Sequence, residues 1–115
     1  MGLEQICIEI YQNNQGKSPY ITWFESIKDL KVISKISIRI ARVRLGNLGD
    51  YKSLGGGLYE LRIDEGPGYR VYFARPVKEN IILLLVGGSK KTQTKDINKA
   101  KQYLNDYIYN KQQKI

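Results

Sequence analysis

The sequence predicts a small α+β domain in which helices pack on a mostly antiparallel sheet. The chain has 115 residues, of which 42% are hydrophobic, and this is enough for one compact domain with its own core. Along the chain, the hydrophobic pattern changes in the order strand, helix, helix, strand, strand, strand, helix. We therefore expect residues 1–115 to form a single domain with a helical hairpin on the sheet.

Alternating isoleucines give residues 5–11 the pattern of a half-buried strand. They are Ile6, Ile8 and Ile10, with Cys7, Glu9 and Tyr11 on the other side. Cys7 is expected to be a small, semi-buried strand residue, because no cationic neighbour is evident that would make its thiol reactive. After a polar loop, Ser18 and Pro19 predict the start of a helix, with Ser18 as the N-cap and Pro19 at the first helical position.

Apolar residues at helical spacing predict two consecutive helices, arranged as a hairpin. The first stripe is Ile21, Phe24, Ile27 and Leu30, and the second is Ile33, Ile36, Ile40 and Val43. Opposite the second stripe, Lys35, Arg39 and Arg42 share one helix face. This face is either an ordinary solvated surface or a surface for phosphates or an acidic partner.

Glycine-rich segments separate the second helix from a series of strands. Residues 46–50 predict the end of that helix, and the three glycines at 55–57 predict a loop. Alternation over residues 59–63 and 69–73, joined by a turn-rich link, predicts an antiparallel hairpin. On this hairpin, Arg62, Arg70 and Tyr72 would share the face away from the core.

The last third of the chain predicts a buried strand followed by a basic helix. The wholly apolar run 81–86 is typical of a central strand covered on both faces. The helix that follows has its apolar stripe at Ile97, Ala100, Leu104 and Tyr107. Gly88, Ser89 and Lys90 lack the earlier glycine of a phosphate-binding ATPase loop, so we do not expect that function.

Charge and composition restrict the classes of function. Nineteen Lys and Arg against eleven Asp and Glu give a net charge of +8, which favours a polyanionic partner, nucleic acid before an anionic membrane surface. The sequence shows no membrane-spanning run and no signal peptide, so we expect a cytoplasmic protein without membrane association. One cysteine and no histidine leave neither a zinc cluster nor the usual general base, and we expect no metal and no cofactor.

Several segments, in their order and spacing, resemble the addiction-module killer proteins of the RelE/ParE toxin superfamily. The similar segments are residues 23–29, 39–42, 46–52, 59–63, 66–73 and 84–90, then Gln93 and residues 95–97. The resemblance implies a RelE-like fold and a type II toxin whose partner is a small helix-turn-helix antitoxin, bound in a higher-order complex. It also implies an endoribonuclease that cuts mRNA in the ribosome, as relatives of the RelE and HigB kind do.

The absence of histidine departs from the HigB pattern and leaves a RelE-like set of Lys, Arg and Tyr. Metal-independent RNA cleavage needs a base for the 2′-OH, positive charge around the phosphorane and an acid for the 5′-oxygen. Arg62, helped by Arg70, would supply the charge, since arginine stays protonated. From their positions in the resembling segments, Lys52 is the candidate base and Lys90 the candidate acid.

Further residues are assigned to binding rather than to the reaction itself. For RNA they are Lys91, which could also replace Lys90, Gln93, Lys95, and Tyr69 or Tyr72 as a platform for a stacked base. For the antitoxin they are Trp23, Arg39 and Arg42 on the helical hairpin. Core packing remains an alternative for Trp23 and Tyr69, and ordinary surface charge remains one for Arg62, Arg70 and Lys90.

Two other functions stay open at this stage. A ParE-like toxin on the same fold would poison DNA gyrase without nuclease chemistry. A basic module of this kind could also bind RNA without cleaving it. Survival of toxicity after neutralisation of Arg62, Arg70 and Lys90 would favour gyrase.

Overall fold

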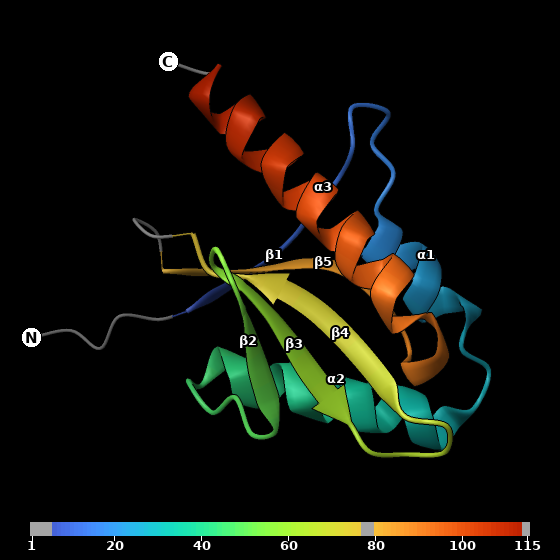
Figure 1. Cartoon of the computed structure of the whole chain (residues 1–115). Coiled ribbons are helices and arrows are strands. Elements are labelled where there is room, and N and C mark those ends of the chain that lie inside the picture. Colours follow the sequence, from blue (N-terminus) through green and yellow to red (C-terminus); the bar gives the residue numbers. More distant parts are fainter. Residues whose placement is uncertain (1–5, 77–79, 114–115) are drawn as a thin grey trace, which may run out of the picture.

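The structure is a computed structural model that describes residues 6–76 and 80–113, so Gln5, the first residue of the first predicted strand, lies outside the described part. The predicted α+β class with a mostly antiparallel sheet is confirmed, with one strand more than expected (Figure 1). The elements are β1 (Cys7–Ile10), α1 (Pro19–Ser26), α2 (Leu30–Arg44), β2 (Tyr51–Gly55), β3 (Leu58–Ile63), β4 (Tyr69–Ala74), β5 (Ile81–Ser89), a 3-10 turn η1 (Lys90–Thr92) and α3 (Gln93–Gln112).

The sheet has the strand order β1-β5-β4-β3-β2. β1 pairs in parallel with β5, and all the other neighbours are antiparallel, including the predicted β3–β4 hairpin. The additional strand is β2, in a region where the sequence predicted only the end of a helix and a loop. Four of its five residues are exposed, so it lacks the alternating apolar pattern that marks a strand. Its pairing with β3 creates it, and Gly55, Gly56 and Gly57, all at positive φ, turn the chain between them.

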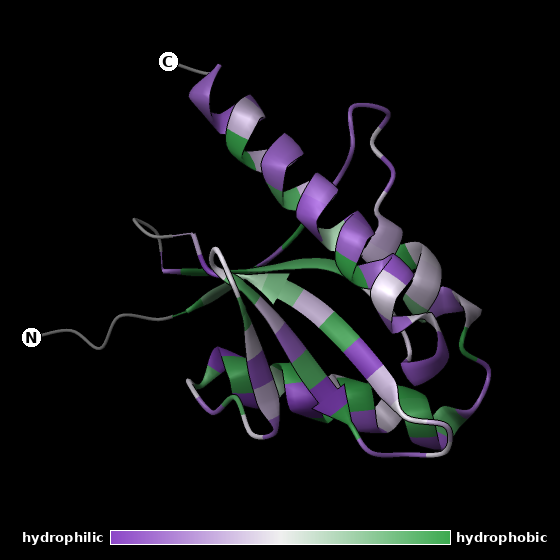
Figure 2. Cartoon of the chain, viewed as in Figure 1, coloured by the Kyte–Doolittle hydropathy of each residue, from purple (hydrophilic) through white to green (hydrophobic). Residues whose placement is uncertain are grey.

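Helices cover both faces of the sheet, so the protein has two apolar cores (Figures 1 and 2). The first core joins α1 and α2 to one face, around Ile36, Leu61 and Phe73. The second core joins α3 to the other face, around Tyr72, Leu85 and Leu104. The central strand β5 is buried from Ile82 to Gly88, as predicted from its apolar run. We expected one face of the β3–β4 hairpin to lie away from the core. α3 covers part of that face, which therefore contributes to the second core.

The helix starts follow from local capping. Ser18 accepts a hydrogen bond from the Ile21 amide, and Pro19 occupies the first turn of α1, as predicted. Asp29 caps α2 in the same way through the Lys31 amide. The predicted stripes are only partly correct, because Ile21 and Leu30 are exposed while Tyr20 and Val32 are buried. The break between α1 and α2 starts a new helix at Leu30, so the three-residue spacing does not continue across it.

Two consecutive glycines in β5 allow close packing on both sides of the sheet. A Cβ atom at Gly87 would lie 2.2 Å from the Trp23 ring, and one at Gly88 would lie 1.8 Å from the Asp96 carboxylate. α1 thus approaches β5 at Gly87, and α3 approaches it at Gly88. Trp23 and Phe24 both pack, half-buried, against the first core, and for Trp23 this is the alternative that the sequence left open.

Cys7 is exposed, contrary to the semi-buried position expected for it. β1 is an edge strand, so only one of its sides is covered by a neighbouring strand. The helices in the described part of the chain are too short or too polar to span a bilayer.

Candidate functional site

The α3-covered side of the sheet carries two neighbouring rows of polar and charged residues. In the first row, Lys52 on β2 pairs with Glu60 on β3, which pairs with Tyr72 on β4. In the second row, Arg62 pairs with Arg70 across the same two central strands. Residues directly opposite each other in a sheet have their Cβ atoms roughly 5 Å apart and point to one face. The pairing therefore brings Lys52, Arg62 and Arg70 to one surface, here called the cationic face.

Glu60 lies at the centre of the cationic face and is completely buried. Its Oε1 accepts from the Nε–H of Arg62 at 3.0 Å, and its Oε2 accepts from the Tyr72 hydroxyl at 3.3 Å and from Nε2 of Gln93 at 2.7 Å. Arg70 Nε lies 3.8 Å from Oε1, so a second guanidinium adjoins the same carboxylate. The carboxylate thus orients Arg62 and ties the start of α3 to the sheet.

The charges around Glu60 decide its protonation state. Burial alone would raise its pKa, but the hydrogen bonds from Gln93 and Arg62 and the charges of Arg62 and Arg70 outweigh burial and hold the pKa below its usual range. Burial and the neighbouring Glu60 carboxylate raise the pKa of Tyr72. At neutral pH the pair is therefore a carboxylate and a neutral phenol. A carboxylate with occupied oxygens and no exposure serves to position its neighbours rather than to take a proton from a substrate.

Lys90 joins the cationic face at the turn between β5 and α3. Its amide donates to the carbonyl oxygen of Gly68 at 3.0 Å, which fixes η1 against the β3–β4 turn. Gly68 has a φ of +85°, and a Cβ atom there would lie 3.5 Å from Arg70 Nη1 and 3.7 Å from the Lys90 Cβ. Arg70 and Lys90 thus flank the same glycine. All four candidate reaction residues therefore lie on the α3 side of the sheet, with Arg62 and Arg70 in the middle, Lys52 on the edge strand β2 and Lys90 after the end of β5.

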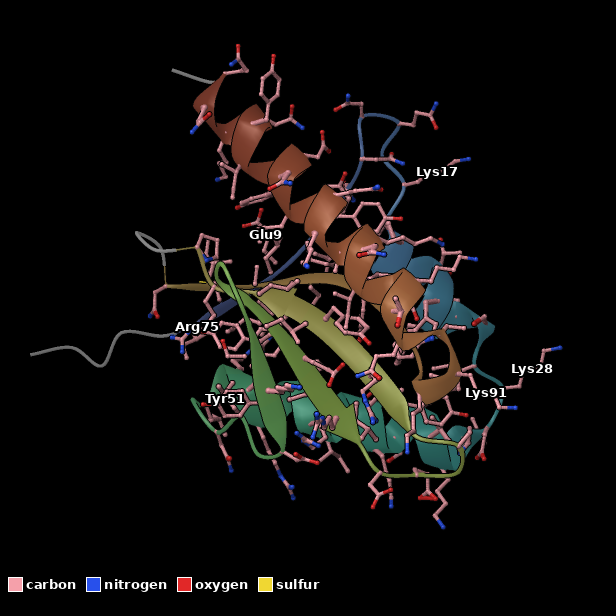
Figure 3. The ribbon with its side chains drawn as sticks, viewed as in Figure 1. Glu9, Lys17, Lys28, Tyr51, Arg75 and Lys91 are labelled. Atoms are coloured by element: carbon pink, nitrogen blue, oxygen red, sulfur yellow. The ribbon has the colours of Figure 1, made fainter. Side chains whose placement is uncertain are left out.

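The start of α3 extends this region. Lys91 and Lys95 are exposed, and Gln93 is half-buried because its amide is engaged by Glu60. Asp96 is buried under Gly88 and accepts a hydrogen bond from the Thr92 hydroxyl. Lys91 projects from the sheet end opposite to Arg75, which follows β4 (Figure 3). Basic side chains such as Lys91 and Lys95, at the end of the sheet where α3 begins, are suited to bind the phosphates of an extended polyanion.

The two tyrosines proposed as stacking platforms are not exposed rings. Tyr72 is completely buried in the second core beneath α3, so its ring is not accessible to a base in this structure. Tyr69 is half-buried and packs against the first core, on the opposite face of the sheet. Their structural roles are to anchor Glu60 and to fill the first core, respectively.

The basic face of α2 is only partly a free surface. Arg39 donates to the carbonyl oxygens of Arg62, Leu48 and Asp50, and thus fastens the loop after α2 to the sheet. Lys35 pairs with Glu65 at 2.7 Å, whereas Arg42 is exposed. Burial and the nearby Arg42 lower the pKa of Arg39, which Asp50 partly opposes. Of the three residues assigned to the antitoxin, Trp23 and Arg39 have structural contacts of their own.

Glu60 and Asp96 are the residues of this region that sequence reasoning missed. A signal for Glu60 existed, because it lies two positions before Arg62 and therefore points to the same face of a strand. Asp96 lies in the first turn of a predicted helix that follows two glycines, but nothing in the sequence shows which glycine it covers.

The sequence is similar to known proteins. The sequence model of the family described as phage-derived protein Gp49-like (DUF891) matches residues 23–105. An uncharacterised protein of Haemophilus influenzae is 49% identical over 80 residues, which cover 70% of this chain and 80% of the relative. The family match contains the cationic face and the start of α3 in full.

Proposed function

The chain belongs to the Gp49-like family of phage-derived proteins, within the RelE/ParE-like toxin superfamily, and from this premise we propose that it cuts messenger RNA on the ribosome. The family is generally associated with toxins of toxin-antitoxin systems. In the proposal, the chain is the toxin, it stops translation, and a helix-turn-helix antitoxin neutralises it in a higher-order complex.

The observation that carries the proposal is the arrangement of arginines around the buried Glu60 carboxylate. Arg62 uses its Nε for Glu60 and keeps a side chain that is 36% exposed, so the outer part of the guanidinium is available to a ligand. Arg70 lies opposite Arg62 in the strand pairing and is held against the same carboxylate. Two guanidinium groups fixed side by side can bind the oxygens of one phosphate in a defined orientation.

The chemistry assigned to this face is transfer of the phosphodiester to the neighbouring 2′-oxygen. Lys52 takes the 2′-OH proton as the 2′-oxygen attacks phosphorus. Arg62 and Arg70 stabilise the additional negative charge of the phosphorane. The bond from phosphorus to the 5′-oxygen then breaks as the Lys90 ammonium protonates that oxygen. The products are a 2′,3′-cyclic phosphate and a free 5′-hydroxyl, and no metal ion is needed.

Binding of RNA is assigned to the basic residues around the reaction centre. Lys91 follows Lys90 directly and Lys95 lies in the first turn of α3, and both would bind the phosphates on one side of the cut. Gln93 contributes indirectly, because its amide is used to hold Glu60. Base stacking on Tyr72 is not included, since its ring is buried.

Induced expression in a heterologous bacterium tests the proposal. Growth, protein synthesis, DNA replication and mapped mRNA ends should be recorded together for the wild type, Arg62→Ala and Arg75→Ala. Arg75 is a matched control, because it is an exposed arginine at the other end of the sheet (Figure 3). We expect new mRNA ends and arrested translation for the wild type and Arg75→Ala, and neither for Arg62→Ala. Intact mRNA with arrested replication would instead indicate a gyrase poison.

A further inference from the structure

The outward face of α2 carries an unusual amount of exposed apolar surface. Leu30, Ile38 and Leu45 are 79%, 48% and 84% exposed, and they are among the most exposed large hydrophobic residues of the described chain. At 100° per residue, Leu30 and Ile38 fall within one quarter of the helix circumference, together with the small residues Ser34 and Ala41, and Leu45 is the C-cap residue that follows α2. We call this row the α2 stripe. Its length is about 22 Å, since each helical residue rises about 1.5 Å.

A groove with basic walls runs beside the α2 stripe. It is lined by Lys35, Ile38, Arg39, Arg42, Ile63 and Asp64. Lys35 is paired with Glu65, and Arg39 is engaged by backbone carbonyls. Arg42 is exposed and has no ion pair within 4 Å among the residues that the structure describes. The uncompensated positive charge of the groove is therefore at its Arg42 end. Asp64 makes the other end unfavourable for an acidic side chain of a partner.

We propose that the α2 stripe is the docking surface for an amphipathic helix of the antitoxin, with acidic residues beside its apolar row. This inference rests on the proposed function, which requires a protein partner. The small residues between the apolar ones allow two helices to approach closely, as in helix pairs with interlocking side chains. An acidic residue of the partner pairs with Arg42, and the position of Asp64 sets the direction in which the helix lies.

The width of the stripe distinguishes a partner helix from a membrane. Helices that lie in a bilayer surface have a broad apolar face, often with Trp or Phe, and many free cations beside it. The α2 stripe is one to two residues wide and contains no aromatic residue. Several of its neighbouring cations already have partners within the chain.

The position of the stripe separates it from the proposed reaction centre. α2 packs on the sheet face around Leu61 and Phe73, whereas the cationic face belongs to the α3 side. Substitutions on the stripe should therefore abolish neutralisation without reducing toxicity. This separation makes the inference testable independently of the nuclease chemistry.

The test uses the protein encoded by the adjacent gene, co-expressed and purified with the full chain, as the partner. The double variant Ile38→Ser with Leu45→Ser should lower its affinity at least about 100-fold, and cells that express it should stay arrested when the partner is present. The matched control is Ile21→Ser with Ile108→Ser, two isoleucines on α1 and α3 that are 37% and 42% exposed. Arg42→Glu should weaken binding about 10-fold or more, with less effect at high salt.

Four results would overturn the inference. They are unchanged affinity of the double variant, a wild-type dimer that the double variant converts to monomer, stripe-dependent binding to phosphatidylglycerol vesicles, and failure of the adjacent protein to bind the wild type. Far-UV circular dichroism checks that the variants are folded. Failure of the proposed function gives a different result, since the wild type would then neither arrest growth nor cut mRNA when expressed alone.

Discussion

Gln93, the first residue of α3, donates its side-chain amide to Oε2 of Glu60 on β3 at 2.7 Å, across 33 positions of sequence. This contact places the basic turn before α3 beside the arginines of the sheet. It also completes the set of donors that keeps a fully buried carboxylate charged. The fold and the candidate site therefore depend on the same side chain.

Glu60→Gln should destabilise the protein and remove part of its pH dependence. At pH 7 the substitution leaves Arg62 and Arg70 without their buried counter-charge, which costs about 3 kcal/mol. The folded pKa of Glu60 lies below the unfolded value of about 4.3, so its stabilisation is complete above that value and is lost as the pH falls through the folded pKa. The difference in unfolding free energy between the wild type and Glu60→Gln, measured by urea unfolding, should therefore become smaller below about pH 5.

Glu65→Gln is the control for this experiment. Lys35 also lowers the pKa of Glu65, but that ion pair is at the surface and should contribute much less to stability. An equal loss of stability in acid for the wild type and Glu60→Gln would contradict the role assigned to the Glu60 carboxylate.

Tyr72→Phe should separate a structural role from a stacking role. The change removes the hydroxyl that donates to Glu60 at 3.3 Å and keeps the ring in the second core. We expect a loss of about 1 kcal/mol in unfolding free energy and RNA binding close to that of the wild type. Tyr69→Phe is the comparison on the opposite sheet face. A large loss of RNA binding by folded Tyr72→Phe would show that the buried hydroxyl contributes to recognition.

The sequence predicted most of the elements because their signals are local. Ser18 and Pro19 marked a helix start that the structure confirms, and the alternation around Arg62 and Arg70 marked the hairpin. β2 was missed, because four of the five residues of Tyr51–Gly55 are exposed and the segment becomes a strand only through its pairing with β3. A strand of this kind is determined by a tertiary contact that no local pattern records.

The sequence predicted which charged residues share the candidate site, but it did not predict which residues of the site are buried. Alternation correctly placed Arg62, Arg70 and Tyr72 on one face, but it could not show that α3 covers part of that face. Glu60 and Tyr72 are buried for that reason, while Arg62 stays partly open. Arg39 illustrates the same limit, since its carbonyl partners come from a loop that folds back on α2.

Gly87→Ala should destabilise the protein through a clash with Trp23. The new Cβ atom would lie 2.2 Å from the indole ring, so α1 or the sheet has to shift, at a cost on the order of 2 kcal/mol. In a Trp23→Leu background the same substitution should cost markedly less, because the ring is gone. Trp23 is the only tryptophan, so its fluorescence can monitor urea unfolding of Gly87→Ala. Circular dichroism is used for the two proteins that carry Trp23→Leu, with and without Gly87→Ala. Equal costs in both backgrounds would contradict this packing.

Arg39→Lys should loosen the loop after α2 although it keeps the charge. The guanidinium reaches the carbonyl oxygens of Leu48 and Asp50 with one nitrogen and that of Arg62 with another, and a lysine cannot reproduce this fork. We expect a loss of about 1–3 kcal/mol. Arg42→Lys, on the same helix and exposed, should leave stability within about 0.5 kcal/mol. Hydrogen exchange of residues 46–50 provides a local measurement, and unchanged protection there would count against the role of Arg39.

Arg62 distinguishes most sharply between a reaction residue and ordinary surface charge. If its outer guanidinium nitrogens hold the phosphorane, Arg62→Ala should lower RNA cleavage on the order of 100-fold or more, because that contact is strongest in the transition state. Arg62→Lys should also be strongly impaired, since it keeps the charge but loses both the Nε bond to Glu60 and the planar fork. Glu60→Gln should then impair cleavage less than Arg62→Ala does, because it misplaces the guanidinium without removing it. Arg75→Ala, at the far end of the sheet, should cleave like the wild type, and full cleavage by either Arg62 variant would move the reaction centre to Arg70 and Lys90.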